Sequence, residues 1–339
     1  MKQRLSLSSL TAVLALVAAL LCHAALAQQK TEIIITRQPG ILYLPSHVME
    51  KQHLIEKQAE ALGLHDLKID WKLLTGGGSQ TDALLAGGVD IVNTGVGNLL
   101  LLWDRTKGGV KGIVANSALP LTLVTRNPKI HTLKDYGPND RIAVPTIKVS
   151  TQAILLQMAA EKEFGPDQTT RLDANTVQLG HPDAAIALAN PQHEITSHFS
   201  APPFSYIELK TVPGAHVVVT SPQIIGGPLT QSQFFTTTKF ADANPKVVAA
   251  IKAASLEAIE FIRKDPRAAV NIYREVMNDK TSADELVDLL KQPGMMDWIA
   301  APQGTMKFAA HLYKVGTLKT MPKAWTDYYL PVAHDLPGN

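Results

Sequence analysis

Cysteine is nearly absent from this chain, since Cys22 is the only one in 339 residues. A single thiol cannot form an intrachain disulfide, so cross-links do not hold this fold together. Cys22 also lies in a segment that we expect to be cleaved, which leaves no thiol for catalysis. A lipoprotein would need a small residue before this cysteine, and Leu21 stands there instead. An exported protein of this size without disulfides fits a bacterial periplasm better than a eukaryotic secretory route.

Long apolar runs are also missing, apart from one near the N-terminus. Leu10–Leu21 is apolar but too short for an ordinary membrane span. Lys2 and Arg4 precede it, and the small-x-small pattern of residues 25–27 follows it. These are the parts of a secretory signal. We therefore predict that residues 1–27 are a signal peptide that is removed, and that the mature chain is a soluble periplasmic protein.

The chain after the signal also has no excess of positive or negative charge. Removing Lys2 and Arg4 with the signal takes 32 basic residues to 30, which equals the 30 acidic residues. This balance gives no electrostatic case for binding nucleic acid or an anionic membrane. Residues 28–339 are enough for two domains of ordinary size.

The sequence lacks the common catalytic signatures. It has no G-x-S-x-G, no H-E-x-x-H, and no lysine after Gly76–Gly78 that could reach a phosphate. The first strand is not followed by the G-x-G-x-x-G of dinucleotide sites, and the histidines show no metal-like pairing. The pattern therefore predicts neither an enzyme nor a bound metal or cofactor.

Two glycine-containing loops are the most informative feature that is present. Gly76–Gly78 leads into Ser79 and Gln80, and residues 94–98 (TGVGN) repeat the device after the next apolar run. Glycine permits a positive φ that turns bare N–H groups into one concavity, and a following helix adds its own free amides. Two such loops predict a cradle for an anion or a polar ligand. The alternative, two ordinary tight turns, stays open.

Alternating strands and helices predict an α/β fold. Residues 32–36 form a β-branched first strand, and 67–73 alternate between apolar and charged residues, which predicts a half-exposed edge strand. The strand–helix order up to 112–116 predicts a mostly parallel sheet. A second, smaller α/β unit begins near 121–125, and the C-terminal third is helical from Asn244-Pro245 on.

Polar residues follow several predicted strands, and ligands in open α/β sheets bind outside these carboxyl ends. The candidate ligand-binding residues are Gln38, Gly78, Ser79, Gln80, Thr94, Gly95, Asn98, Asn116, Lys148, Ser150, Thr151, His198, Phe199, Ser200 and Phe204.

Several candidates have a structural alternative. Ser150 is placed to cap the helix that follows it, and Lys148 can be a solvated loop charge. His198 can be a hydrogen-bonded structural histidine, and Phe204 can belong to the core. No arginine stands in the candidate loops to clamp a strongly charged ligand, which keeps weakly charged or aromatic ligands open. The side chains that would stack on a ring are Tyr43, Phe199 and Phe204.

Four segments in register resemble the periplasmic solute-binding proteins of the nitrate, sulfonate and taurine ABC importers. This group also includes the binding proteins for thiamine-pyrimidine precursors. The segments are LLAGGVDIVNTGVGNLLLL, TLKDYGPNDRIAVP, HFSAPPFSYIEL and FADANPKVVAAIKAASLEAIEFI. The resemblance extends over essentially the whole chain after the signal.

The resemblance implies a type II periplasmic-binding fold, in which two α/β lobes enclose a ligand cleft and the C-terminal part is helical. Its crossover segments would fall near residues 117–121 and 220–231. The implied division is residues 28–118 with 229–339 for lobe I, and residues 119–228 for lobe II.

The resemblance also implies a function: capture of a small anionic or polar organic solute, similar to a sulfonate, taurine or nitrate, by closure of the lobes. The implied partners are an ABC permease and its ATPase, with no nucleic acid, and the protein is expected to be a monomer. Three alternatives stay open: a binding protein for thiamine-pyrimidine precursors, a synthase-like enzyme of that pathway, or a module that presents its ligand to a membrane receptor.

Overall fold

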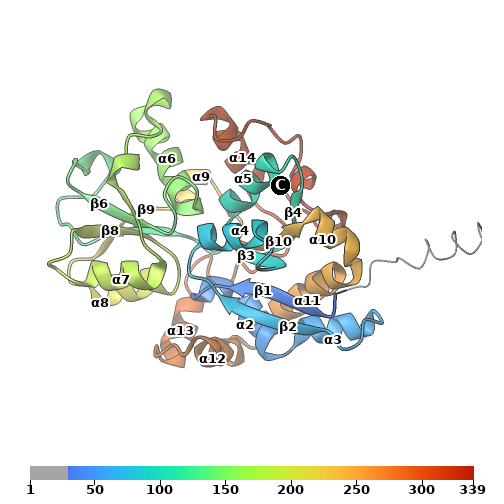
Figure 1. Cartoon of the computed structure of the whole chain (residues 1–339). Helices are drawn as coiled ribbons and strands as arrows, with labels where there is room; N and C mark the ends of the chain where they lie inside the picture. Colours follow the sequence, from blue (N-terminus) through green and yellow to red (C-terminus); the bar gives the residue numbers. More distant parts are fainter. Residues whose placement is uncertain (1–29) are drawn as a thin grey trace, which may run out of the picture.

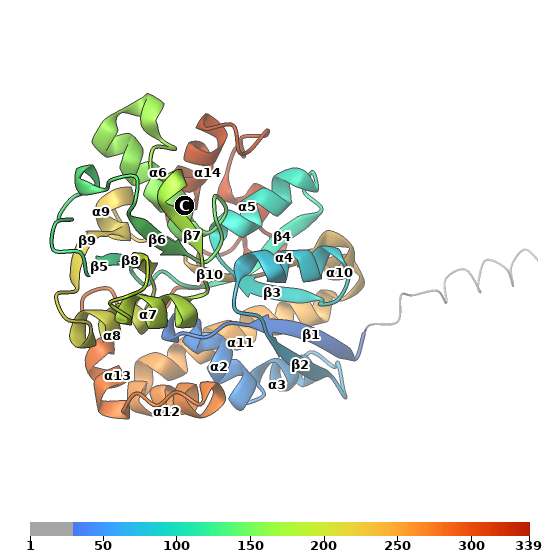
Figure 2. The same ribbon diagram turned by 60° about the vertical axis from the view of Figure 1, so that its left-hand side comes forward.

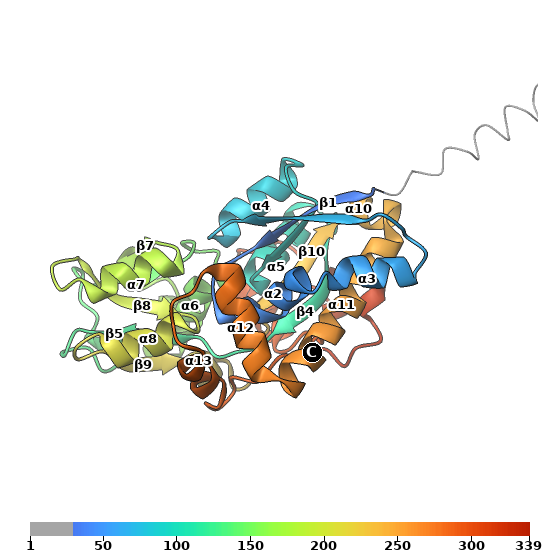
Figure 3. The same ribbon diagram turned by 90° about the horizontal axis from the view of Figure 1, so that it is seen from below.

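The computed structural model describes residues 30–339 (Figure 1). The predicted signal peptide, residues 1–27, lies outside the described residues. In the described part of the chain, no helix is long and apolar enough to cross a membrane. Two bodies are visible, each built around its own five-stranded sheet, and we call them the first lobe and the second lobe (Figures 1 and 3).

The first lobe contains a sheet of strand order β2-β1-β3-β10-β4. Its strands are β1 (Glu32–Arg37), β2 (Lys68–Leu73), β3 (Ile91–Thr94), β4 (Val110–Ser117) and β10 (Ser232–Thr237). Its helices are η1 (Ile41–Tyr43), α2 (Leu44–Lys51), α3 (Leu54–Ala61), α4 (Gly77–Leu85), α5 (Val96–Arg105), α10 (Thr238–Ala243), α11 (Pro245–Lys264), α12 (Pro266–Met277), α13 (Ala283–Leu290), α14 (Thr305–Lys314), η5 (Trp325–Tyr328) and η6 (Pro331–Ala333).

The second lobe contains a sheet of strand order β7-β6-β8-β5-β9. Its strands are β5 (Thr122–Thr125), β6 (Arg141–Val144), β7 (Thr176–Gln178), β8 (Ile195–Ser200) and β9 (His216–Thr220). Its helices are η2 (Leu133–Asp135), α6 (Thr151–Phe164), η3 (Pro166–Gln168), η4 (Asp173–Asn175), α7 (His181–Ala189), α8 (Phe204–Thr211) and α9 (Ser221–Ile225).

The two sheets share one topology. In each sheet four strands run in one direction, and the fourth strand in spatial order is antiparallel to both of its neighbours. That antiparallel strand is β10 in the first lobe and β5 in the second. Each is the first strand after the chain enters its sheet from the other lobe, so the chain passes between the lobes twice. The α/β prediction is confirmed, and β2 is the half-exposed edge strand that its alternation predicts.

Apolar residues at the predicted positions build the core. Ile33 and Ile35 of β1 are fully buried, and α11 packs on α3, α2 and β4 with Ile251 and Ile262 fully buried. The helices of the second lobe cover both faces of its sheet (Figure 2). Parallel strands need this two-sided cover, because their side chains are apolar on both faces.

The C-terminal segment is fixed to the first sheet by buried aromatic rings. Tyr329 is fully buried, and its hydroxyl donates a hydrogen bond to Gln233 Oε1 at 2.6 Å. Leu330 N–H donates to Gly112 O at 2.7 Å, next to the ring. A Cβ at Gly112 would lie 2.6 Å from the Tyr329 ring, so β4 needs glycine here for close packing.

Candidate functional site

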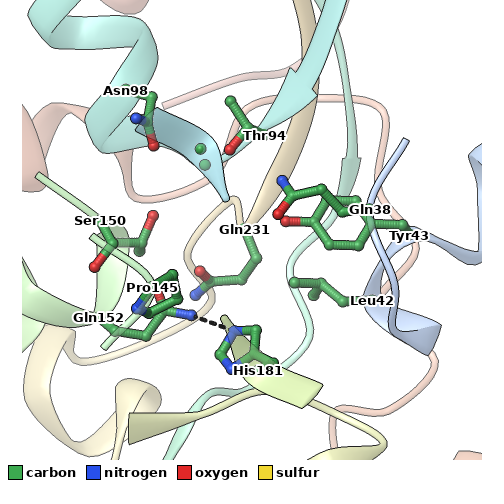
Figure 4. Close-up of a pocket in the computed structure, with 13 residues that line it drawn as sticks. Gln38, Leu42, Tyr43, Thr94, Asn98, Pro145, Ser150, Gln152, His181 and Gln231 are labelled. Carbon is green, nitrogen blue, oxygen red and sulfur yellow. Dashed lines mark hydrogen bonds between the residues drawn. The ribbon is translucent and has the colours of Figure 1, made fainter. Parts of the chain in front are cut away.

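A small cavity lies between the two lobes (Figure 4). The space open to the centre of a water-sized sphere is only about 20 Å³, which is room for a few atoms. The residues that line it are Gln38, Leu42, Tyr43, Gly77, Thr94, Gly95, Asn98, Pro145, Ser150, Thr151, Gln152, His181 and Gln231. They come from both lobes, and Gln231 comes from the connection that returns to β10.

Four helix N-termini meet at this cavity. Gly77 is the first residue of α4, Gly95 precedes α5, Thr151 begins α6 and His181 begins α7. The first amides of a helix have no carbonyl within that helix to bond to, and the helix dipole places partial positive charge there. Of the four helices, only α6 has a side-chain cap, in which Ser150 Oγ accepts from Ala153 N–H at 3.2 Å. The other three keep amides free for an anion.

The glycines in these loops are explained by close approach and not by a left-handed turn. The prediction of positive φ at Gly76–Gly78 is wrong: Gly76 is extended, with φ −143°, and the next two glycines are helical. A Cβ at Gly77 would lie 2.6 Å from both Thr94 Oγ1 and Asn98 Oδ1. A Cβ at Gly95 would lie 2.5 Å from Thr151 Oγ1 in the other lobe. A side chain at either position would push the cavity walls apart.

Several buried polar atoms around the cavity have no hydrogen-bond partner among protein atoms. They include Asn98 Nδ2, Thr151 Oγ1, and both Nε2 and Oε1 of Gln231. Each of these three side chains is only 3% exposed. An unpaired buried polar group costs about 1–3 kcal/mol. These atoms can be satisfied together by a polar ligand in the cavity that they line.

The cavity wall carries no formal charge among the described residues. It contains no lysine, arginine, aspartate or glutamate. Arg37, at the end of β1, is engaged by Glu50 at 3.1 Å and by Val276 O at 3.3 Å. Burial and the neighbouring His198 hold the pKa of His181 well below its ordinary value. Burial raises the pKa of Tyr43. Both rings are therefore neutral at pH 7.

Three buried side chains extend from the cavity into the second lobe. His181 Nδ1 lies 2.8 Å from His198 Nε2, and His198 Nδ1 lies 2.6 Å from Glu208 Oε1. The other ring nitrogen of His181 lies 3.0 Å from Gln152 Nε2 at the cavity wall (Figure 4). His198 and Glu208 are 0% and 1% exposed. We call these three residues, His181, His198 and Glu208, the histidine relay.

The structure brings together part of the predicted site. The predicted residues that line the cavity are Gln38, Thr94, Gly95, Asn98, Ser150 and Thr151.

Four other predicted residues of the first lobe do not line it. Ser79 is exposed and its hydroxyl donates to Gly76 O at 2.8 Å, while Gly78 packs near Thr146. Gln80 is buried, but its amide is used within the lobe: Oε1 accepts from Asn93 N–H and Nε2 donates to Leu74 O. Asn116 is fully buried behind the wall, with its amide unpaired.

The remaining predicted residues lie in the second lobe and are also absent from the wall. Lys148 is exposed, and His198 lies behind His181. Phe199 is fully buried in the hydrophobic core, because successive side chains of β8 point to opposite faces. Ser200 is buried with an unpaired hydroxyl, and Phe204 stacks on His181 with ring centroids 5.9 Å apart.

Some lining residues were not among the candidates. Gln152 follows Thr151 on the first turn of α6, and His181 follows Gly180 at the start of α7. Both positions could have been predicted from the sequence, because each lies at the start of a helix that follows a strand. Gln231 carries none, because it lies in a connection without a repeating pattern. The other missed lining residues are Leu42, Gly77 and Pro145.

The donor set does not suit a resident metal. Residues 30–339 contain no group of three or more His, Cys, Asp or Glu side chains that could hold a metal ion. Histidine, cysteine and carboxylate are the side chains that most metal sites use.

Comparisons with known proteins bear on the fold. No family model and no curated protein matches the chain. Among solved structures, the alkanesulfonate-binding protein SsuA from Xanthomonas axonopodis pv. citri, bound to MOPS, is similar with TM-score 0.68 and 16% identity, covering 86% of this chain and 96% of that one. The periplasmic aliphatic sulphonate binding protein SsuA from Escherichia coli gives TM-score 0.65 and 17% identity, covering 89% and 92%. The periplasmic nitrate-binding protein NrtA from Synechocystis PCC 6803 gives 0.63 and 13%, covering 90% and 83%. The chain therefore has the periplasmic-binding-protein fold that its two sheets and its interlobe cavity indicate.

Proposed function

We propose that this protein is the periplasmic solute-binding component of an ABC importer and that it captures a small anion by lobe closure. The observation that carries the proposal is the composition of the cavity wall: four helix N-termini and unpaired buried donors, with no charged side chain among the described lining residues. The similarity to sulfonate- and nitrate-binding proteins supports the same ligand class. The protein would act as a monomer that delivers its ligand to a permease and ATPase, without covalent chemistry.

The energetics of such a wall are sufficient for capture. Micromolar binding needs about 8 kcal/mol. One helix N-terminus contributes about 0.3–1 kcal/mol, and up to about 2 kcal/mol when partly buried. Hydrogen bonds to a charged group add about 1.5–3 kcal/mol each. Four N-termini with two or three such bonds therefore reach the required range before the costs of association are subtracted.

The wall also favours a particular ligand charge and size. Helix N-termini and neutral donors can stabilise one negative charge, but no lysine or arginine is present to balance a second one. The cavity has room for only a few atoms, which suits a head group such as nitrate or a sulfonate. A longer organic solute would need a wider opening of the lobes than this arrangement has.

Isothermal titration of residues 28–339 tests the proposal. The probes are sodium nitrate, methanesulfonate and taurine, with sodium sulfate and an aminopyrimidine for comparison. Amine buffers are required, because sulfonate buffers would themselves be candidate ligands. Saturable binding of a monoanion, with weaker binding of sulfate, is the expected result. No binding of any probe would overturn the proposal, and turnover of a substrate would then favour an enzyme.

A further inference from the structure

The histidine relay has a chemical property that anion capture alone does not require. It places two imidazoles and a carboxylate in one buried row that ends at the cavity wall. A structural histidine needs only one hydrogen-bond partner. Here both nitrogens of each ring have a partner, and at least one partner of each ring is itself titratable. Such a row can hold a different number of protons while keeping the same heavy-atom positions.

Two hydrogen-bond arrangements fit the observed distances. In the first, His198 is neutral and donates from Nδ1 to the Glu208 carboxylate, and its Nε2 accepts from His181 Nδ1–H. His181 Nε2 then carries a lone pair, which accepts from Gln152 Nε2–H at 3.0 Å. The row has a net charge of −1 in this arrangement, and it offers no proton to an anion in the cavity.

In the second arrangement the row holds one more proton. His198 is now protonated on both nitrogens, so that it donates to Glu208 from Nδ1 and to His181 Nδ1 from Nε2. The single proton of His181 is then on Nε2, which becomes a donor at the cavity wall, and the Gln152 amide turns so that its oxygen accepts. The net charge of the row becomes zero.

From this difference we propose that the protein binds its anion together with one proton, which is held by the histidine relay. The inference rests on the proposed function and specifies how the same site recognises its ligand. An anion in the cavity is repelled by the row of charge −1 and is not repelled by the row of charge zero. Because the coupling is reciprocal, binding of the anion draws in the proton, and protonation tightens binding of the anion.

Glu208 is the side chain that sets the charge of the relay. Within the described residues, no other charged side chain hydrogen-bonds to either histidine. The other titratable or charged side chains on elements packed against the relay are Tyr43 (η1), Arg141 (β6), Glu161, Lys162 and Glu163 (α6), Asp183 (α7), and Tyr206 and Lys210 (α8). Burial and the neighbouring His198 hold the pKa of His181 well below its ordinary value, so His181 is the neutral ring in both arrangements.

The test combines a pH series with a direct count of protons. Neither nitrate nor methanesulfonate titrates between about pH 5.5 and 8.5. Any proton taken up on binding therefore goes to the protein. We expect the affinity for the better probe to fall by up to tenfold per pH unit as the pH rises above the titration of the relay. We expect uptake approaching one proton per anion, measured with a pH-stat in unbuffered solution.

Variants locate the proton. Glu208→Gln removes both the carboxylate that stabilises the added proton and the negative charge of the unprotonated row, and we expect it to lose most of the pH dependence. The matched control is Glu285→Gln, because Glu285 is an exposed carboxylate that pairs with Lys210 and not with the relay. The control should keep the wild-type pH profile. His198→Gln offers a second variant if circular dichroism shows that Glu208→Gln does not fold, and it should abolish proton uptake because the added proton is held on His198.

The outcomes separate the two proposals. Saturable binding with an affinity that is constant across the pH series and no proton uptake would overturn the proton coupling and leave the proposed function intact. Binding of no probe at any pH would overturn the proposed function, and the coupling with it. The wild-type measurements decide between these outcomes without any variant.

Discussion

Thr151 shows at the scale of one residue how the site differs from an ordinary helix start. Its hydroxyl is buried, has no protein partner, and faces Gly95 across the two lobes. The sequence predicted this residue because a serine N-cap and a threonine follow a short strand. It could not predict His181 or Gln231 as their neighbours, because only the approach of the two lobes brings these segments together.

Replacement of Thr151 by valine keeps the shape and removes the hydroxyl. We expect anion binding about tenfold weaker or more, since a hydrogen bond to a charged ligand contributes about 1.5–3 kcal/mol. The free protein should be at least as stable, because the buried hydroxyl has no hydrogen-bond partner to lose. Titration calorimetry checks this result, with Ser79→Ala as the control because its hydroxyl bonds only to Gly76 O. Unchanged affinity in Thr151→Val would remove the residue from the site.

His47 provides a second test at this scale, through the pH dependence of stability. Burial and the charge of Arg37 lower its pKa to about 3 in the folded state, below the ordinary value of 6.5. The unfolded chain therefore binds more protons between these values. The contribution is fully present above pH 6.5 and is lost as the pH falls toward 3, by at most about 1.4 kcal/mol per pH unit.

Urea unfolding of His47→Gln between pH 6.5 and 4 measures this contribution. In the wild type this proton makes the free energy of unfolding rise by at most about 1.4 kcal/mol per pH unit. The variant should lose this part of the pH dependence. His53→Gln is the control, because His53 lies in the same helical region with a side chain that is 77% exposed. A slope in His47→Gln equal to that of the wild type would contradict the assignment.

At the scale of single elements, patterns that repeat within one strand or helix were sufficient for prediction. Examples are the half-exposed edge strand β2 and the Ser150 cap of α6. The role of the glycines was predicted wrongly, because glycine answers two needs that look alike in sequence. At Gly77 and Gly95 the need is close packing against another segment, which no local pattern records.

Gly112 tests the same packing argument away from the cavity. A Cβ there would lie 2.6 Å from the Tyr329 ring, so Gly112→Ala should destabilise the protein by about 1–3 kcal/mol through overpacking. The control is Gly88→Ala, because the nearest atom to a Cβ at Gly88 is Ala83 O at 3.6 Å. Urea denaturation checks both variants. Equal free energies of unfolding for the two variants would mean that β4 tolerates a side chain where it packs against the C-terminal segment.

For the whole molecule, the account depends on movement of one lobe against the other. The chain crosses between the sheets twice, and the cavity as described is too small to admit an organic solute from outside. A ligand that enters an open form and is then enclosed gains stronger electrostatic contacts, because water is excluded. Gly95 lies where the lobes meet, since a Cβ there would lie 2.5 Å from Thr151 Oγ1.

Gly95→Ala should oppose closure without straining the open form. Its φ of −71° and ψ of 159° suit alanine, but a Cβ would lie 2.5 Å from Thr151 Oγ1 in the closed arrangement. We expect an unchanged melting temperature without ligand, weaker anion binding, and a smaller ligand-induced decrease in the radius of gyration by X-ray scattering. Addition of Thr151→Gly should restore part of the decrease. Full contraction in Gly95→Ala would show that the lobes do not need this contact.

The central claim is that neutral donors from both lobes hold one small monoanion between them. A crystal structure of residues 28–339 grown with methanesulfonate, in a buffer free of other sulfonates, tests it most directly. We expect sulfonate oxygens within hydrogen-bond distance of Asn98 Nδ2 and Thr151 Oγ1 and of the amides at the start of α5. A sulfonate held elsewhere by lysine or arginine side chains, or an interlobe cavity that stays without it at saturating concentration, would contradict the account.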